Sequence, residues 1–189
     1  RSTLFPYTTL FRSPYRNYEI EIHCSEDFPH QFPALFETGG KIPKIGDWHV
    51  YEDTLACCVK VHPEEILRCK KGITVTEYIR ETVVPYLFNQ THRRQEGYYV
   101  NGEYAHGVAG IYQFYADELQ SGTDIRLTIA LIKYIAANSR PVRTSMCFCG
   151  KKEKFRNCHR EAFDKLKELG EDVLKSHGFA IAKAAGINF

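Results

Sequence analysis

Residues 18–38 read YEIEIHCSEDFPHQFPALFET, and this stretch decides the fold class predicted for the chain. Apolar and polar side chains alternate over 18–24, which is typical of a β-strand with one buried face. Pro29 and Pro33 then exclude a helix, because proline lacks the backbone N–H that a helix interior needs. The stretch therefore predicts a strand, an extended turn and a second strand that ends near Thr38.

Helical patterns follow further along the chain. Thr74 and Glu77 form an S/T-x-x-E capping signal, which predicts a helix running towards Asn89 with a kink at Pro85. Apolar residues at helical spacing predict further helices over about 103–119, 124–138 and 161–177. Strands followed by helices indicate an α+β fold.

Two glycines stand inside the helix predicted over 103–119. Gly107 and Gly110 lack a Cβ atom, so they permit another segment to approach the helix closely. We therefore expect tight packing against a neighbour at this helix.

The run TLFPYTTLFRS, residues 3–13, does not fit this organisation. It keeps neither helical nor strand periodicity, and its apolar runs are shorter than the roughly 20 residues that span a bilayer. The run equals the translation of a common short-read sequencing adapter. We therefore expect residues 1–13 to be an assembly artefact, and the native protein to begin near Pro14 with its own N-terminus missing.

Composition places the rest of the chain among globular proteins. The 189 residues are 43% hydrophobic, which permits one domain with a real core and a small appendage. The net charge of +2 includes Arg1 and Arg12, so acidic and basic residues balance without residues 1–13. This balance argues against whole-molecule attraction to nucleic acid or to a membrane. Seven cysteines, an odd number, favour thiols and metal ligands in a reducing cytoplasm over a secreted disulfide framework.

The most specific local motif is CFCGKKEKFRNCH, residues 147–159. Four soft or borderline ligands can close a tetrahedral, structural zinc site here, namely Cys147, Cys149, Cys158 and His159. Gly150 permits the tight turn between the ligand pairs. The alternative, a chance gathering of core cysteines, is disfavoured in a lysine-rich loop. The spacing resembles the SEC-C family motif, a short C-x-C-G and C-H/C zinc knuckle, although Lys151 and Lys152 replace its usual Ser and Gly.

A second resemblance covers about residues 14–119. Pro14-Tyr15 before the first strand, and the FPHQFP turn of residues 28–33, resemble the start of the ubiquitin-conjugating enzyme core. Residues 49–58, HVYEDTLACC, resemble the His-Pro-Asn and Asp-Gly-x-x-Cys-Leu segment of that family, especially its shorter bacterial form. The resemblance implies an antiparallel meander sheet with packed helices, truncated at its N-terminus. We expect this core over 14–120 and a helical extension with the zinc knuckle over 121–189.

The resemblance implies that one cysteine carries a ubiquitin-like C-terminus as a thioester. Cys57 fits the gapless alignment, eight residues after His49 and four after Asp53, whereas Cys58 fits with one inserted residue. We favour Cys57 and keep Cys58 as the alternative. Adjacent side chains of an extended segment point to opposite faces, so one of the two thiols should be buried. The alternative without catalysis is that both cysteines are small core residues.

The residues around the thiols depart from the family pattern. His49 is expected to organise the loop rather than to act as a general base. Val50 and Tyr51 replace the Pro-Asn pair, which removes an amide donor to the oxyanion, and losing one such donor costs about 3 kcal/mol. Tyr51, a backbone amide or a later polar residue must substitute, or activity is weak. His106 is a further acid–base candidate, although a capping or packing role is favoured.

These features predict thioester-mediated transfer of a protein C-terminus in a bacterial ubiquitin-like pathway, with antiphage signalling as one context. The implied partners are a ubiquitin-like or nucleotidyltransferase-type protein cargo, bound by its C-terminus, and an activating enzyme. The competing class is a non-catalytic protein-binding adapter that uses the zinc knuckle for docking. A redox role for a Cys57–Cys58 disulfide ranks third.

The segment around the knuckle is basic. Residues 140–167 contain nine Lys or Arg against three Asp or Glu. Clustered cations are typical of a surface that binds nucleic acid, or of a solvent-exposed zinc loop that docks an acidic protein tail. The scarcity of stacking aromatics favours the second interpretation.

Overall fold

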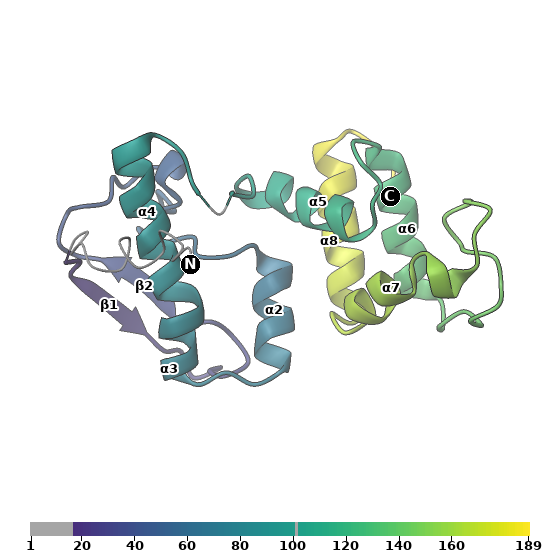
Figure 1. Ribbon diagram of the computed structural model, residues 1–189, viewed down its shortest axis with the longest axis horizontal. Coiled ribbons are helices and arrows are strands. Elements are labelled where there is room, and N and C mark those ends of the chain that lie inside the picture. Colours follow the sequence, from purple (N-terminus) through teal and green to yellow (C-terminus); the bar gives the residue numbers. More distant parts are fainter. Residues whose placement is uncertain (1–16, 101) are drawn as a thin grey trace, which may run out of the picture. The chain divides into compact units, whose positions relative to one another are not determined.

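The computed structural model describes residues 17–100 and 102–189, so the expectations for residues 1–16 lie outside it. The chain forms two compact units (Figure 1). Within the described residues, the first unit comprises 17–26, 33–59, 75–100 and 102, and the second comprises 27–32, 60–74 and 103–189. Helices and strands are both present, which confirms the α+β class.

The first unit contains a small antiparallel sheet. Strand β1 (Ile20–His23) pairs with β2 (Ala34–Glu37), and Ile22 lies opposite Leu35. Both strands were predicted from their alternation and from the two prolines between them. No third strand joins this sheet within the described residues, where the only further bridge of this unit links Val50 and Cys57. The larger meander sheet of a ubiquitin-conjugating enzyme is therefore not confirmed.

Glu37 holds the loop that follows β2. Its side chain is buried, and its carboxylate accepts hydrogen bonds from the backbone N–H groups of Lys41 and Ile42 at 3.1 and 3.2 Å. Lys44 lies 3.6 Å away and supplies a positive charge. A buried carboxylate needs such partners, because its desolvation is otherwise costly. The loop is thereby fixed on the edge of the two-stranded sheet.

One long helical segment completes the first unit. It consists of α3 (Val75–Tyr78), the π-helical turn η2 (Ile79–Val83) and α4 (Val84–Glu96). The π turn lies directly before Pro85, where a kink was predicted; proline cannot supply the N–H of a regular helix, and a widened turn absorbs that defect. The helix ends at Gly97, whose φ of 86° suits glycine, and therefore runs beyond the predicted end.

The second unit is helical. It contains α2 (His62–Lys70), α5 (Gly107–Glu118), α6 (Ile125–Ala137), α7 (Arg160–Lys167) and α8 (Glu171–Ala184). Helix α8 packs against both α5 and α6 (Figure 1). The core of this unit is formed by fully buried side chains, including Phe114, Ile132, Phe163 and Leu174. None of the described helices is both long and apolar enough to cross a membrane.

Two features of the second unit differ from the prediction. The single helix predicted over 161–177 is wrong, because Gly170, with a φ of 93°, separates α7 from α8. Helix α2 was not predicted, although Pro63 in its first turn and Glu64 beside it are typical start signals. Because α2 and α5 both belong to this unit, it begins well before residue 121.

Candidate metal centre and thiol site

The metal motif lies at the end of a short antiparallel hairpin. Cys147 donates its backbone N–H to the carbonyl oxygen of Glu153 at 2.8 Å, and Met146 bridges to Lys154. Gly150, with a φ of 81°, lies in the connecting turn. The 3₁₀ turn η3 (Phe155–Asn157) then leads the chain to the second ligand pair.

Aromatic packing fixes this hairpin on the helices. Phe155 and Phe163 are fully buried and meet edge to face, with ring centroids 5.8 Å apart. Phe148 stacks on Tyr134 of α6 at 4.4 Å, with the rings nearly parallel. These contacts bury large apolar areas, so the two ligand pairs are positioned by the core of the second unit.

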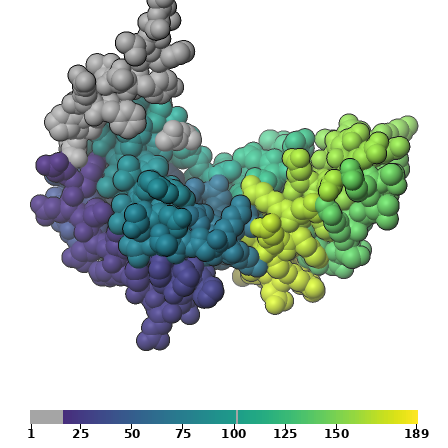
Figure 2. Space-filling model, turned by 60° about the horizontal axis from the view of Figure 1, so that its bottom comes forward, coloured from purple at the N-terminus to yellow at the C-terminus, as the bar shows by residue number. Residues whose placement is uncertain are grey.

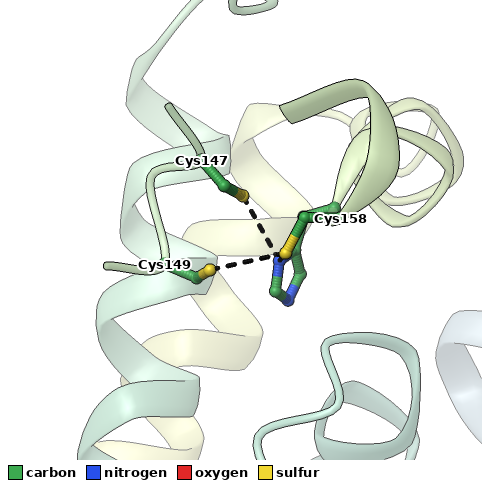
Figure 3. Close-up of side chains that lie close together, drawn as sticks. Cys147, Cys149 and Cys158 are labelled. Atoms are coloured by element: carbon green, nitrogen blue, oxygen red, sulfur yellow. Dashed lines mark hydrogen bonds between the residues drawn. The ribbon is translucent and has the colours of Figure 1, made fainter. Parts of the chain in front are cut away.

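Four donor atoms converge at this place. The sulfur atoms of the three cysteines and a ring nitrogen of His159 all lie within 4.8 Å of one another. Sγ of Cys158 lies 3.6 Å from Sγ of Cys149 and 3.0 Å from Nδ1 of His159, which is itself 3.4 Å from Sγ of Cys147. Figure 3 shows the three thiols pointing toward one another from two segments of the loop. The cluster could therefore hold a metal ion, and all four predicted ligands belong to it.

His159 is oriented from its other side. Its ring is buried, and Nε2 lies 2.6 Å from the carbonyl oxygen of Leu119, at the end of α5. A carbonyl oxygen can only accept, so Nε2 carries the proton and Nδ1 presents its lone pair to the thiols. Metal-bound histidines are typically held in this way.

Two of the three thiols in the cluster have pKa values that are shifted in opposite directions. Burial, together with hydrogen bonds to Cys149 and Cys147, raises the pKa of Cys158 to about 12. Burial acts in the same direction on Cys147, but hydrogen bonds to the backbone of Cys149 and His159 outweigh it and lower the pKa of Cys147. One thiol is thus prepared for ionisation while its neighbour stays protonated, and a bound cation would allow both to ionise.

The other predicted site lies in the first unit, on a tight reversal of the chain after η1 (Gly46–Trp48). Tyr51 donates its N–H to the carbonyl oxygen of Ala56 at 2.9 Å, and Cys58 donates its own to the carbonyl oxygen of His49 at 2.7 Å. These bonds place His49 and Cys58 opposite each other across the reversal. His49 adopts a left-handed conformation with a φ of 51°.

The two adjacent cysteines have different surroundings, as their alternation predicts. Cys57 is buried, its N–H is bonded to the carbonyl oxygen of Leu35 at 2.7 Å, and its thiol interacts with the hydroxyl of Tyr86. Burial raises the pKa of Cys57, and the hydrogen bond with Tyr86 only partly opposes this effect. Cys58 is half-buried. Of the two thiols, Cys58 is therefore the more accessible.

A histidine accompanies the accessible thiol. A ring nitrogen of His49 lies within 4.8 Å of Sγ of Cys58. The His49 ring packs edge-on against Tyr99, with centroids 5.0 Å apart, and its carbonyl oxygen accepts a hydrogen bond from the Tyr86 hydroxyl at 3.0 Å. The backbone of His49 is thus hydrogen-bonded within the reversal, and its ring stands near a thiol. Sequence spacing alone did not reveal this pairing with Cys58.

His106 is the N-cap residue of α5, although its side chain makes no capping hydrogen bond. Tyr51, which stands where the resemblance expects asparagine, is 45% exposed. Comparisons with models of protein families, with curated proteins and with solved structures found no match to this chain.

Proposed function

We propose that this protein transfers an acyl group through a thioester on Cys58, and that the acyl group is the C-terminus of a ubiquitin-like or nucleotidyltransferase-type protein. The observation that carries the proposal is the half-buried Cys58 thiol with a ring nitrogen of His49 within 4.8 Å. A thiol and an imidazole at such a separation form the usual arrangement of an activated sulfur nucleophile, and free enzymes often hold the pair loosely.

The reaction has two steps. The Cys58 thiolate attacks the carbonyl carbon of a thioester held by an activating enzyme, so a new C–S bond forms while the bond to the enzyme breaks and its thiolate leaves. An acceptor amine then attacks the Cys58 thioester, a C–N bond forms, and the Cys58 thiolate is released. A proton leaves the attacking nitrogen in this second step, and we assign His49 as the group that receives it.

Cys57 is the competing nucleophile, and two variants separate the candidates. Cys58→Ser should trap an ester-linked adduct that resists thiol reductant but is lost in mild hydroxide, because an alkoxide leaves less readily than a thiolate. Cys57→Ser should keep reductant-sensitive charging. The assay is gel electrophoresis with and without thiol reductant, together with mass spectrometry, on protein expressed with the neighbouring genes of its source contig. Trapping by Cys57→Ser instead would return the nucleophile to Cys57, and unchanged charging in both variants would remove the acyl-transfer proposal.

A non-catalytic adapter is the second candidate, and the surface around the metal motif favours it. Residues 140–160, green in Figure 2, lie at the surface of the second unit. Five of their cationic side chains are exposed and lack an ion pair within the described residues, namely Arg143, Lys151, Lys152, Lys154 and Arg156. Such a surface suits an acidic protein tail. Reversal of Lys152 and Lys154 to glutamate should abolish cellular function under this alternative, while both thiol variants remain active.

We propose further that the metal is zinc and that its role is structural. Three thiolates and one imidazole are a donor set that zinc prefers, and a tetrahedral ion with zinc bond lengths places its ligand atoms about 3.5 to 3.8 Å apart. Of the three distances given above for the cluster, 3.4 and 3.6 Å approach these values, and the 3.0 Å between Sγ of Cys158 and Nδ1 of His159 is shorter. Four protein ligands leave no position for water, which argues against a catalytic role. Elemental analysis should find one zinc per chain, and a metal-free protein with unchanged stability would remove the proposal.

A further inference from the structure

The second unit contains a pocket that neither the metal centre nor the thiol site uses. Its volume is about 330 Å³, and it lies between residues 27–32 and helix α2. The helix contributes His62, Glu65, Ile66 and Cys69, which recur at the spacing of one helical face. The size falls in the range of sites for small molecules, and apolar and polar side chains converge in it.

The acidic side chains that line this pocket are not matched by lining lysines or arginines. Two carboxylates, those of Asp27 and Glu65, belong to its lining, whereas no Lys or Arg does. Among the described residues, none forms a hydrogen bond or an ion pair with the Glu65 carboxylate. Lys60, whose charge acts on Glu65, is paired instead with Glu64 at 3.5 Å. A half-buried carboxylate without a direct partner is costly, and a cation in the pocket would remove that cost.

The pKa of the Glu65 carboxyl agrees with a pocket that accepts a cation. Burial raises its pKa to about 7, the charge of Lys60 opposes the rise, and the charge of Glu64 adds to it. Glu65 is therefore close to half protonated at neutral pH and can ionise fully when a positive group arrives.

His62 is presented to the pocket in a fixed orientation. Its Nδ1 lies 3.0 Å from Nε2 of His177, whose Nδ1 lies 2.9 Å from the hydroxyl of Tyr115. Burial, reinforced by the neighbouring His62, lowers the pKa of His177 to about 4, so the His177 ring carries no charge at neutral pH. Because Nδ1 of His62 is hydrogen-bonded to His177, Nε2 is the ring nitrogen that can contact a ligand, and the His177 ring hydrogen-bonded to His62 is uncharged.

We propose that this pocket binds a small organic ammonium compound, such as a short aliphatic diamine. Asp27 and Glu65 neutralise the ammonium groups, and the apolar side chains of Ile66 and Phe32 cover the carbon chain between them. Ammonium binding is favoured because each charge gains a partner that the protein itself does not supply.

The test uses 1,4-diaminobutane as the probe and 1,4-butanediol, of equal length but without charge, as its control. Isothermal titration with the zinc-loaded full chain should detect the diamine and not the diol. Glu65→Gln, which keeps the shape of the side chain, should weaken diamine binding at least tenfold. Glu64→Gln, which changes the adjacent carboxylate outside the pocket, should leave binding within twofold, and thermal denaturation checks that both variants are folded.

Three results would overturn the proposal. They are equal affinity for diamine and diol, equal weakening by Glu65→Gln and Glu64→Gln, and absence of diamine binding at tens of millimolar. Binding of Ni²⁺ through His30 and His62, with no response to the diamine, would assign the pocket to a metal instead and would also contradict the proposal.

Discussion

The carbonyl oxygen of Leu119, at the end of α5, lies 2.6 Å from Nε2 of His159, whose Nδ1 belongs to the metal cluster. One imidazole thus joins the end of a core helix to the candidate metal site. Substitutions of His159 can therefore separate metal ligation from this orienting bond. His159→Cys keeps four ligands but loses the bond to Leu119, whereas His159→Ala loses both.

We expect His159→Cys to retain one metal ion per chain and to lose about 1 kcal/mol of stability, the typical value of one hydrogen bond. His159→Ala should lose metal as well and be destabilised by several kcal/mol, because metal binding contributes directly to folding. Elemental analysis and chemical denaturation provide the two measurements. Full metal content in His159→Ala would show that His159 is no ligand.

Metal removal should act locally. We expect a strong chelator, or Cys149→Ser, to speed amide hydrogen exchange at Cys147 and Phe155, because their backbone bonds belong to the hairpin that a bound metal would close. Amides in the middle of α8 should be nearly unaffected. Cys24→Ser, at an exposed thiol in the first unit, is the matched control. Equal acceleration throughout α8 would mean that the metal holds the whole second unit rather than the loop.

Thiol reactivity should distinguish the adjacent cysteines. Iodoacetamide in limiting amount should label Cys24 and Cys58 well before Cys57, because Cys57 is buried and burial raises its pKa, which reduces the reactive thiolate. Peptide mass spectrometry over a time course measures the order. Cys24, which is exposed, serves as the internal standard. Faster labelling of Cys57 than of Cys58 would contradict the assignment of Cys58 as the nucleophile.

Local signals in the sequence predicted much of this structure. The alternation over 18–24 and the two prolines predicted both strands. Alternation is typical of a strand with one buried face, and prolines exclude a helix because they lack the N–H group. The ligand spacing of 147–159 identified the cluster that could hold a metal ion, because all four donors come from one short loop. Such features depend on neighbours in sequence, which is why they are visible there.

Contacts between distant segments were not visible. The hydrogen bond from His159 to Leu119 and the pocket beside α2 both depend on tertiary packing. Helix α2 was not predicted because its buried side is short and consists of Pro63, Leu67 and Cys69. The break at Gly170 was missed because the apolar spacing continues from α7 into α8, and only the positive φ reveals that the helix stops.

Acid should destabilise the second unit through His177. Burial lowers the pKa of His177 to about 4 in the folded protein, while an unfolded histidine titrates near 6.5. The contribution of the neutral His177 ring to the free energy of unfolding is therefore fully present above pH 6.5. It is lost as the pH falls towards 4, because the unfolded chain binds a proton at a higher pH than the folded protein does. The expected loss is on the order of 3 kcal/mol.

The comparison with His177→Gln isolates this effect. Glu65 has a raised pKa and acts in the opposite direction over part of the same range, but it is present in both proteins. The difference in unfolding free energy between wild type and variant should therefore shrink from pH 7 to pH 4. A difference that is independent of pH would show that His177 titrates normally.

Close packing at the start of α5 provides the last prediction. A Cβ atom at Gly110 would lie 1.9 Å from the carbonyl oxygen of Ala105, a backbone atom that cannot move aside without displacing the segment before the helix. Gly110→Ala should therefore cost about 3 kcal/mol, although alanine ordinarily favours a helix over glycine by about 1 kcal/mol. Gly46→Ala is the matched control, because the nearest atom there lies at 3.7 Å. Urea denaturation measures both variants. Equal stability of Gly110→Ala and wild type would mean that residues 103–106 do not pack on the first turn of α5, and the tight contact anticipated from the two glycines would be absent.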